Sequence, residues 1–201
     1  MSIKTISFAL MALLPFLANP VASQGQNPIN QDGCVTNYDP NFDYFTNKIT
    51  VDNATLFSVH YERNYKVVVN NALKKEYVLT QCGTPVPPAS QFGNETVFVN
   101  IPVKNAASTA TTAVAFIEML GMRSALKAVD TEGLISSPCL QYDLERGSIL
   151  GIEDKDLAKR ADQFKSVDVV FSTFGSEPGM ENKTVITSEV SDPGPLHVAA
   201  P

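Results

Sequence analysis

An alternation of short apolar runs with amphipathic patterns, from residue 97 to residue 187, constrains the fold more than any other feature of this sequence. The apolar runs, at residues 97–101, 126–129, 167–171 and 185–187, are typical of strands buried on both faces of a parallel sheet. Between them lie a helical pattern that begins near Ser108 and ends at Gly121, and a charged helix at about residues 153–164. Strands that alternate with helices predict a parallel α/β unit with right-handed crossovers.

A different pattern precedes this unit. Residues 56–61, 65–69 and 76–80 read as strands, with Asn70-Asn71 between the last two as in a hairpin loop, and they predict a small antiparallel sheet. Residues 81–91 hold four chain breakers and are expected to form a Pro-rich linker. The predicted organisation is therefore an irregular aromatic arm at 24–55, the small sheet and linker at 56–91, and the α/β unit at 92–201.

The first 23 residues carry the features of a secretory signal peptide. Lys4 supplies a positive start, residues 6–17 form an apolar run, and Val21-Ala22-Ser23 offers small residues at a cleavage site. The apolar run is shorter than the roughly 20 residues that a membrane-spanning helix needs, and no later stretch is apolar enough to span a bilayer. We therefore expect cleavage after Ser23 and a secreted product, extracellular or associated with the cell wall. A single-pass anchor is the alternative.

Three Asn-X-Thr sequons support the same address. They begin at Asn53, Asn94 and Asn182, and we expect each to lie on an exposed turn or strand end and to be a glycosylation site.

The charge balance limits the classes of partner that the protein can bind. The chain has a formal net charge of -6, and removal of Lys4 with the signal peptide leaves 14 Lys and Arg against 21 Asp and Glu. An acidic chain disfavours nucleic acid and anionic membrane surfaces as partners.

Three cysteines, Cys34, Cys82 and Cys139, would lie in an oxidising compartment, where disulfides persist. An odd number leaves one without a partner. We predict a disulfide between Cys34 and Cys82, because both flank the segment that has the least hydrophobic core. Cys139 is then the unpaired cysteine.

No set of residues in the sequence suggests catalysis. His60 and His197 are far apart and have no flanking motif, and neither an HxxH nor a CxxC spacing for zinc is present. The acidic residues around the charged helix are typical of its solvated face. We therefore predict that the protein is not an enzyme, and we expect no cofactor and no metal site.

The candidate ligand-binding residues follow from position, because open α/β sheets bind ligands at the carboxyl ends of their parallel strands. Ser108 and Thr109 lie where a strand ends and a helix begins, and free N–H groups at such a place attract anions. Ordinary helix capping is the alternative for both. The remaining candidates are Lys104, which could meet a ligand carboxylate, Ser136 and Ser137 in the loop at 130–140, and Tyr142 and Phe174, which offer apolar contact.

The order of these segments resembles that of the helical-backbone periplasmic binding proteins, the substrate-binding components for iron-siderophores, haem and cobalamin. The stretch at 97–129 with its Val-Asn-Ile-Pro-Val-Lys run resembles the start of such a protein, and Phe-Lys-Ser-Val-Asp-Val-Val-Phe at 164–171 resembles a later strand. Residues 65–69 and 77–85 resemble the secreted fungal and oomycete relatives. The resemblance covers about residues 34–198 and implies the amino-terminal lobe of a periplasmic-binding-like fold.

The resemblance implies an extracellular solute-binding module for a metal chelate such as a siderophore or haem. It names no ligand contacts, because no motif for them is recognisable here. The family clamps its ligand between two lobes joined by a long helix, and this sequence stops about where that helix should begin. We therefore expect a truncated lobe that offers half of a binding site. The alternative is a small secreted scaffold that binds another protein and takes no small-molecule ligand.

Overall fold

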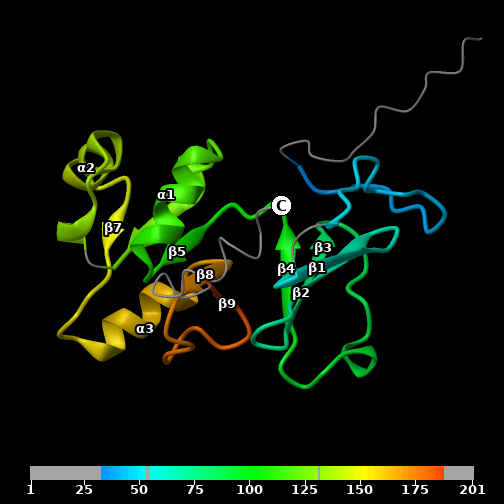
Figure 1. Cartoon of the computed structure of the whole chain (residues 1–201). Coiled ribbons are helices and arrows are strands. Elements are labelled where there is room, and N and C mark those ends of the chain that lie inside the picture. The colour runs from blue at the N-terminus through cyan, green and yellow to red at the C-terminus, as the bar shows by residue number, and fades with distance from the viewer. Residues whose placement is uncertain (1–32, 53–54, 131, 188–201) are drawn as a thin grey trace, which may run out of the picture.

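The computed structural model describes residues 33–52, 55–130 and 132–187, and these residues form an α/β protein with two sheets (Figure 1). One sheet has four strands and the other has five, and three helices flank the larger sheet. The α/β fold class predicted from the alternation is therefore confirmed. The predicted signal peptide and Asn53 lie outside the described residues, as do the ends of the arm and of the α/β unit. No helix in the described ranges is long and apolar enough to cross a membrane.

The smaller sheet has the strand order β1-β2-β3-β4. Its strands are β1 (Phe57–Tyr61), β2 (Tyr65–Asn70), β3 (Lys75–Gln81) and β4 (Val97–Ile101). The first three pair antiparallel through tight connections, as their alternating sequences predict. The linker between β3 and β4 contains a short 3₁₀ helix, η1 (Ala89–Gln91), and it carries the chain back so that β4 runs parallel to β3.

The position of β4 corrects the prediction for this strand. Its apolar sequence was expected to begin the larger parallel sheet, but it pairs with β3 and lies at the edge of the smaller sheet. Val99 is buried against the other sheet while Asn100 is exposed. The strand is apolar because one of its faces covers a neighbouring sheet, and a short apolar run does not show which sheet provides its hydrogen bonds.

The larger sheet is wholly parallel and has the order β7-β6-β5-β8-β9. Its strands are β5 (Ala106–Ser108), β6 (Leu126–Val129), β7 (Leu150–Gly151), β8 (Val169–Ser172) and β9 (Thr184–Ile186). The central strand, β5, therefore lies between the strand predicted at 97–101 and the helix predicted to begin near Ser108, where the sequence analysis placed no strand. Its residues Ala-Ala-Ser give a weak strand signal, because small side chains carry little of the apolar pattern on which the prediction depends.

The three helices are α1 (Thr111–Met119), α2 (Pro138–Glu145) and α3 (Leu157–Lys165). Helix α2 lies in a segment that was predicted as a loop, although Ser137 followed by Pro138 is a helix-start signal: the Ser137 hydroxyl accepts from the backbone N–H of Leu140. Helix α3 begins later than predicted because Asp156 caps it, accepting from the N–H groups of Ala158 and Lys159. Two short 3₁₀ helices, η2 (Arg123–Ala125) and η3 (Glu132–Leu134), lie in the connections.

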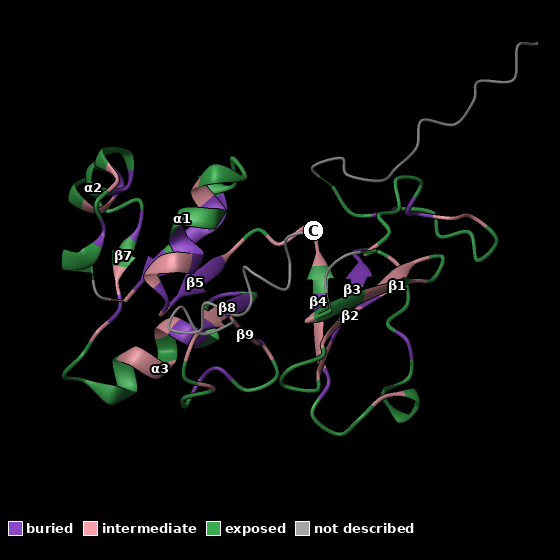
Figure 2. Ribbon diagram, viewed as in Figure 1, coloured by how far each residue is buried: buried purple, intermediate pink, exposed green. Residues whose placement is uncertain are grey.

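The helices cover both faces of the parallel sheet. Helices α1 and α2 pack on one face, where Val114, Ile117 and Leu140 meet Leu126 and Val129 of β6. Helix α3 packs on the other face, where Phe164 is fully buried in a cluster with Ala107, Val170 and Met180. Figure 2 shows the buried sides of the helices turned toward the sheet. The arrangement is that of a doubly wound α/β fold.

The two sheets pack against each other. Val99 of β4, Ala106 of β5 and Val169 of β8 form one buried cluster, and the backbone N–H of Ile186 in β9 donates to the Tyr77 hydroxyl of β3 at 3.0 Å. The aromatic arm is attached to the smaller sheet by the predicted disulfide between Cys34 and Cys82, which is confirmed. Next to it, the Val35 N–H donates to the Cys82 carbonyl at 2.9 Å. Cys139 is free and exposed.

Candidate functional site

The carboxyl ends of the five parallel strands define one candidate site, which we call the carboxyl edge. The chain enters this sheet at β5, proceeds outward through β6 and β7, and returns to pair β8 on the other side of β5. The gap between the connections of β5 and β8 is therefore the topological switch point, where doubly wound sheets bind their ligands. Thr109, Asp130 and Glu153 follow the ends of β5, β6 and β7 along this edge.

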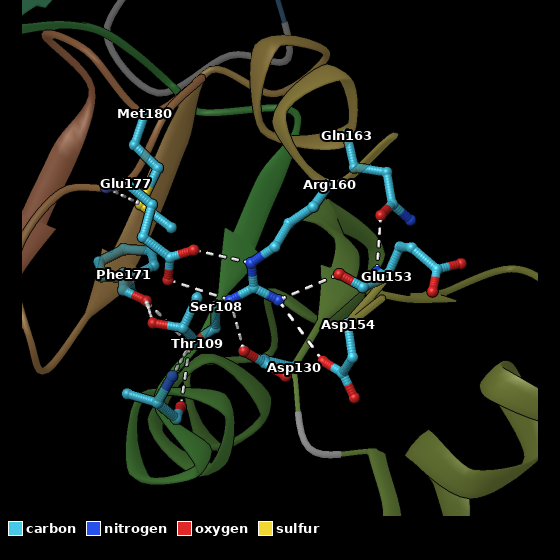
Figure 3. Close-up of polar contacts among 11 residues, drawn as sticks. Ser108, Thr109, Asp130, Glu153, Asp154, Arg160, Gln163, Phe171, Glu177 and Met180 are labelled. Carbon is cyan, nitrogen blue, oxygen red and sulfur yellow. Dashed lines mark hydrogen bonds and ion pairs between the residues drawn. The ribbon is translucent and has the colours of Figure 1, made fainter. Parts of the chain in front are cut away.

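Arg160 of α3 occupies the centre of the carboxyl edge (Figure 3). Its guanidinium holds both oxygens of Glu177, with Nε at 2.7 Å and Nη2 at 3.0 Å, and Nη2 also donates to Asp130 at 2.9 Å. Nη1 donates to the Glu153 carbonyl at 3.4 Å and forms an ion pair with Asp154 at 3.6 Å. One side chain therefore fastens α3 to the loops that follow β6, β7 and β8.

The electrostatics of this edge favour structure over anion binding. The hydrogen bonds that Arg160 donates to Glu177 raise its pKa; burial opposes this, but the hydrogen bond to Asp130 adds to the increase. The pKa therefore lies above its ordinary value and the guanidinium is permanently charged. Its side chain is only 12% exposed and is already shared among three carboxylates. An incoming anion would find these N–H groups engaged and negative charges around them. No cluster of metal-binding side chains occurs in the described parts of the chain.

Ser108 and Thr109 lie at the switch point, as predicted, but their polar groups point inward to the protein. The Ser108 hydroxyl donates to the Ala110 carbonyl at 2.9 Å and is fully buried. The Thr109 N–H donates to the Phe171 carbonyl at 2.8 Å, and the two hydroxyls lie 3.4 and 3.5 Å from the same oxygen. These bonds close the gap between β5 and β8 (Figure 3). The cap residue of α1 is Ala110, which has no side-chain acceptor.

The other candidates of the carboxyl edge are not gathered into one site. Ser137 donates to Glu118 at 2.7 Å as well as capping α2, and the neighbouring Ser136 is exposed. Tyr142 is exposed on α2, where its ring stacks with the Arg146 guanidinium, and Phe174 is 90% exposed in the loop after β8. Arg160, which organises this edge, was missed in the sequence because its partners are distant along the chain.

Lys104 lies elsewhere, in a cleft between the two sheets that we call the inter-sheet cleft. One wall is the outer strand β4 with the Cys34–Cys82 disulfide, and the other is formed by the segments that lead into β5 and β8. The cleft has a volume of about 550 Å³, within the roughly 300–1,000 Å³ that is usual for small-molecule sites. It opens at the amino ends of β5 and β8, the opposite edge of the sheet from the predicted site.

The inter-sheet cleft is rich in cations. Lys104, Lys165 and Lys183 line it, together with the single carboxylate of Asp168. The Lys183 ammonium is occupied by three carbonyl groups at the end of α3, and that of Lys165 is bonded to Asp162. Asp168 accepts from the backbone N–H groups of Lys104 and Asn105, at 3.1 and 2.9 Å. Among the described residues, the Lys104 ammonium has no partner.

Two of the three sequons can be placed. Asn94 and Asn182 both lie on exposed turns, as predicted, whereas Asn53 is outside the described residues.

The chain has no significant match among protein-family models, curated proteins or solved structures.

Proposed function

We propose that this protein is a secreted, non-enzymatic module that binds an anionic solute in the inter-sheet cleft. The observation that carries the proposal is the position of Lys104 between two walls of the molecule, with an ammonium that has no partner among the described residues. The backbone at Lys104 is held by Asp168, so the side chain projects from a fixed point. An ammonium in such a position can pair with a ligand carboxylate or another anionic group.

The inter-sheet cleft has two walls that can enclose a ligand, whereas the carboxyl edge of a single lobe offers only half of a binding site. At that edge, the Phe174 side chain is 90% exposed, so most of its apolar surface is uncovered in the described chain. In the inter-sheet cleft, residues Phe98 and Val99 of β4 contribute to one wall, and Lys165 and Lys183 of the α/β unit contribute to the other. Ligand sites combine apolar walls with a few polar groups that fix orientation. The resemblance supplies the ligand class, a metal chelate such as a siderophore or haem. Because the cleft is lined by lysines, we expect it to bind only those chelates that carry an anionic group.

The test is a ligand-induced thermal shift across ferric siderophores, haem and cobalamin, since a ligand that binds only the native state raises the melting temperature. We expect anionic chelates to raise it. The variant Lys104→Gln should weaken the binding about tenfold, as the loss of one charge-assisted hydrogen bond predicts. The matched control is Lys155→Gln, which changes an exposed lysine near the start of α3, at the opposite end of that helix from Lys165.

Equal loss of affinity in Lys104→Gln and Lys155→Gln would contradict the proposed site, because it would reflect only the total charge. Absence of binding by every chelate would contradict the proposed function and favour the alternative, a scaffold that binds another protein.

One observation supports that alternative. Phe116, Met119 and Leu120 are spaced so that they share one face of α1, and all three are more than half exposed. The helix has one charged residue, Glu118, and helices that are apolar all round are usually covered.

Changing Phe116 and Met119 to Lys should leave the melting temperature within a few degrees of the parent and abolish pull-down of a protein partner. Unchanged pull-down would exclude this face as the binding surface.

A further inference from the structure

A second cavity lies at the amino ends of the parallel strands, on the opposite edge of the sheet from the carboxyl edge and Arg160. We call it the amino-edge pocket. It has a volume of about 510 Å³ and is formed where α1 ends, where β6 and β7 begin, and where α2 ends. The 3₁₀ helix η2 forms part of its wall. Its polar lining residues are Arg123, Ser124, Lys127, Asp143, Arg146 and Ser148, with Glu118 at the end of α1.

The two arginines are held by one buried carboxylate. Asp143 of α2 is only 6% exposed, and its two oxygens meet different guanidinium groups: Oδ2 lies 3.0 Å from Arg123 Nε, and Oδ1 lies 3.2 Å from Arg146 Nε. The Arg146 guanidinium also stacks on the Tyr142 ring, at 5.2 Å from its centroid. These contacts fix two cationic groups side by side at the pocket, so part of the entropy cost of ordering them for a ligand has already been met.

The hydrogen-bonding capacity of the pair is almost unused. Within the described ranges of the chain, each guanidinium meets Asp143 through Nε, and no Nη atom of Arg123 or Arg146 has a hydrogen-bond partner, although each side chain carries five N–H groups in a planar fork. Their side chains are about half exposed, at 43% and 55%, so a ligand can reach them. The hydroxyls of Ser124 and Ser148, which also line the pocket, likewise have no partner among the described residues.

The charge balance leaves the pocket positive. One carboxylate compensates one guanidinium, so Asp143 with its two arginines retains one positive charge. Lys127 adds another, with its ammonium 2.8 Å from the Ser124 carbonyl, and Glu118 opposes it but is bonded to Ser137. The lining therefore has three cations against two carboxylates, in a chain whose formal net charge is -6. A role limited to fixing Asp143 would require only one arginine.

We propose that the amino-edge pocket binds a tetrahedral oxyanion, a phosphate or sulfate group, between Arg123 and Arg146. Two guanidinium forks offer several N–H donors to different oxygens of one anion, and phosphate geometry suits such bidentate contacts. Ser124 and Ser148 supply neutral donors beside them. The site is separate from the inter-sheet cleft and does not depend on the function proposed for that cleft.

Isothermal titration calorimetry of the whole secreted chain tests this proposal, with inorganic phosphate, inorganic sulfate and a phosphate monoester as separate titrants and sodium chloride at matched ionic strength as the reference. We expect phosphate or sulfate to bind one per chain and chloride not to compete. A phosphate monoester that binds more tightly than inorganic phosphate would identify an esterified ligand; the reverse order would identify the free ion. No heat with any of the three oxyanions would overturn the proposal.

Variants separate the site from general charge. Arg146→Gln should reduce the affinity at least about tenfold, and Arg146→Lys should reduce it less, because lysine keeps the charge but loses the fork. Lys159→Gln, which removes the same charge on α3, is the control and should leave the affinity within about twofold. Arg123→Gln gives a second measurement, and thermal unfolding shows which variants are folded. Folded arginine variants that bind as tightly as the parent would also overturn the proposal.

Discussion

Arg160 is the side chain on which the carboxyl edge depends most. It joins helix α3 to Asp130, Glu153, Asp154 and Glu177, which lie in three separate loops. Its guanidinium also lies over the Phe164 ring, at 5.1 Å from the centroid, and so contacts the core beneath the helix. Arg160 therefore makes both electrostatic and apolar contacts at the edge of the sheet where the sequence predicted a ligand site.

We expect Arg160→Gln to lower the free energy of unfolding by about 2–3 kcal/mol, because it leaves Asp130 and Glu177 close together without their shared cation. Lys159→Gln changes the adjacent residue, whose ammonium is exposed and meets Glu153 alone among the described residues, and it should lower the free energy of unfolding by less than about 0.5 kcal/mol. Urea unfolding of both variants measures the difference. Equal stabilities would show that the Arg160 contacts contribute no more than a surface ion pair.

Gly83 is a second residue with a specific requirement. It has a φ angle of +82°, and a Cβ at this position would overlap the backbone of Val35, which pairs there with Cys82. Gly147 also has a positive φ angle, of +73°, but has open space around it. Gly147→Ala should therefore lower the free energy of unfolding by about 1 kcal/mol, because of its backbone conformation alone. Gly83→Ala should lower it by about 2 kcal/mol more, because the arm must also move. Thermal unfolding compares the pair; a Gly83→Ala cost no greater than that of Gly147→Ala would contradict the close approach.

At the level of secondary structure, the disulfide compensates for an arm that has no helix or strand in its described part. The arm packs by its rings, with Tyr44 and Phe45 buried, and the cross-link attaches it to the end of β3. The bridge closes a loop of 48 residues in sequence separation. A loop of this length restricts the unfolded chain substantially.

Replacing Cys34 and Cys82 together with Ser should lower the free energy of unfolding by about 4 kcal/mol on the loop-entropy model. Cys139→Ser, which changes an exposed and unpaired thiol of α2, should leave it unchanged within about 0.5 kcal/mol. Chemical denaturation measures both. Peptide mapping without reduction is the direct check on the pairing, and a peptide that joined Cys139 to either partner would contradict it.

The sequence predicted some of these elements better than others, for physical reasons. Strand β6 was predicted with its bounds because Leu126 and Val129 have the large apolar side chains of a buried strand. Strand β5 was missed because its alanines carry no such pattern, although both are buried. Of the candidate site, sequence reasoning found the location of Ser108 and Thr109, but their bonds to Phe171 depend on the return of the chain at β8.

The whole molecule is joined across its two sheets by the cluster of Val99, Ala106 and Val169. Since this cluster draws on both sheets, we expect them to unfold together. Five of the six tyrosines lie in the arm or the smaller sheet, and the three α-helices of the described part of the chain flank the larger sheet. Tyrosine fluorescence and the far-ultraviolet helix signal therefore report mainly on different parts of the molecule.

We predict that the two signals give coincident unfolding transitions, as two-state behaviour requires. Val99→Ala should lower the midpoints of both by the same amount, corresponding to about 2 kcal/mol. Val86→Ala, at a side chain that is half exposed in the linker, is the matched control and should leave both midpoints nearly unchanged. Two separate transitions in the parent protein would show that the sheets are independent.

The central position of β5 also has a consequence for the order in which the chain folds. Its pairing with β6 joins Ala106 to Leu126, whereas its pairing with β8 joins Ala106 to Val169, across a much longer loop. The longer loop costs more entropy to close, so the β5–β8 pairing should form last. Asp168 then fixes its register by accepting from the N–H groups of Lys104 and Asn105. Until that moment one side of β5 remains an unpaired apolar edge, and we expect misassembly during refolding to begin there.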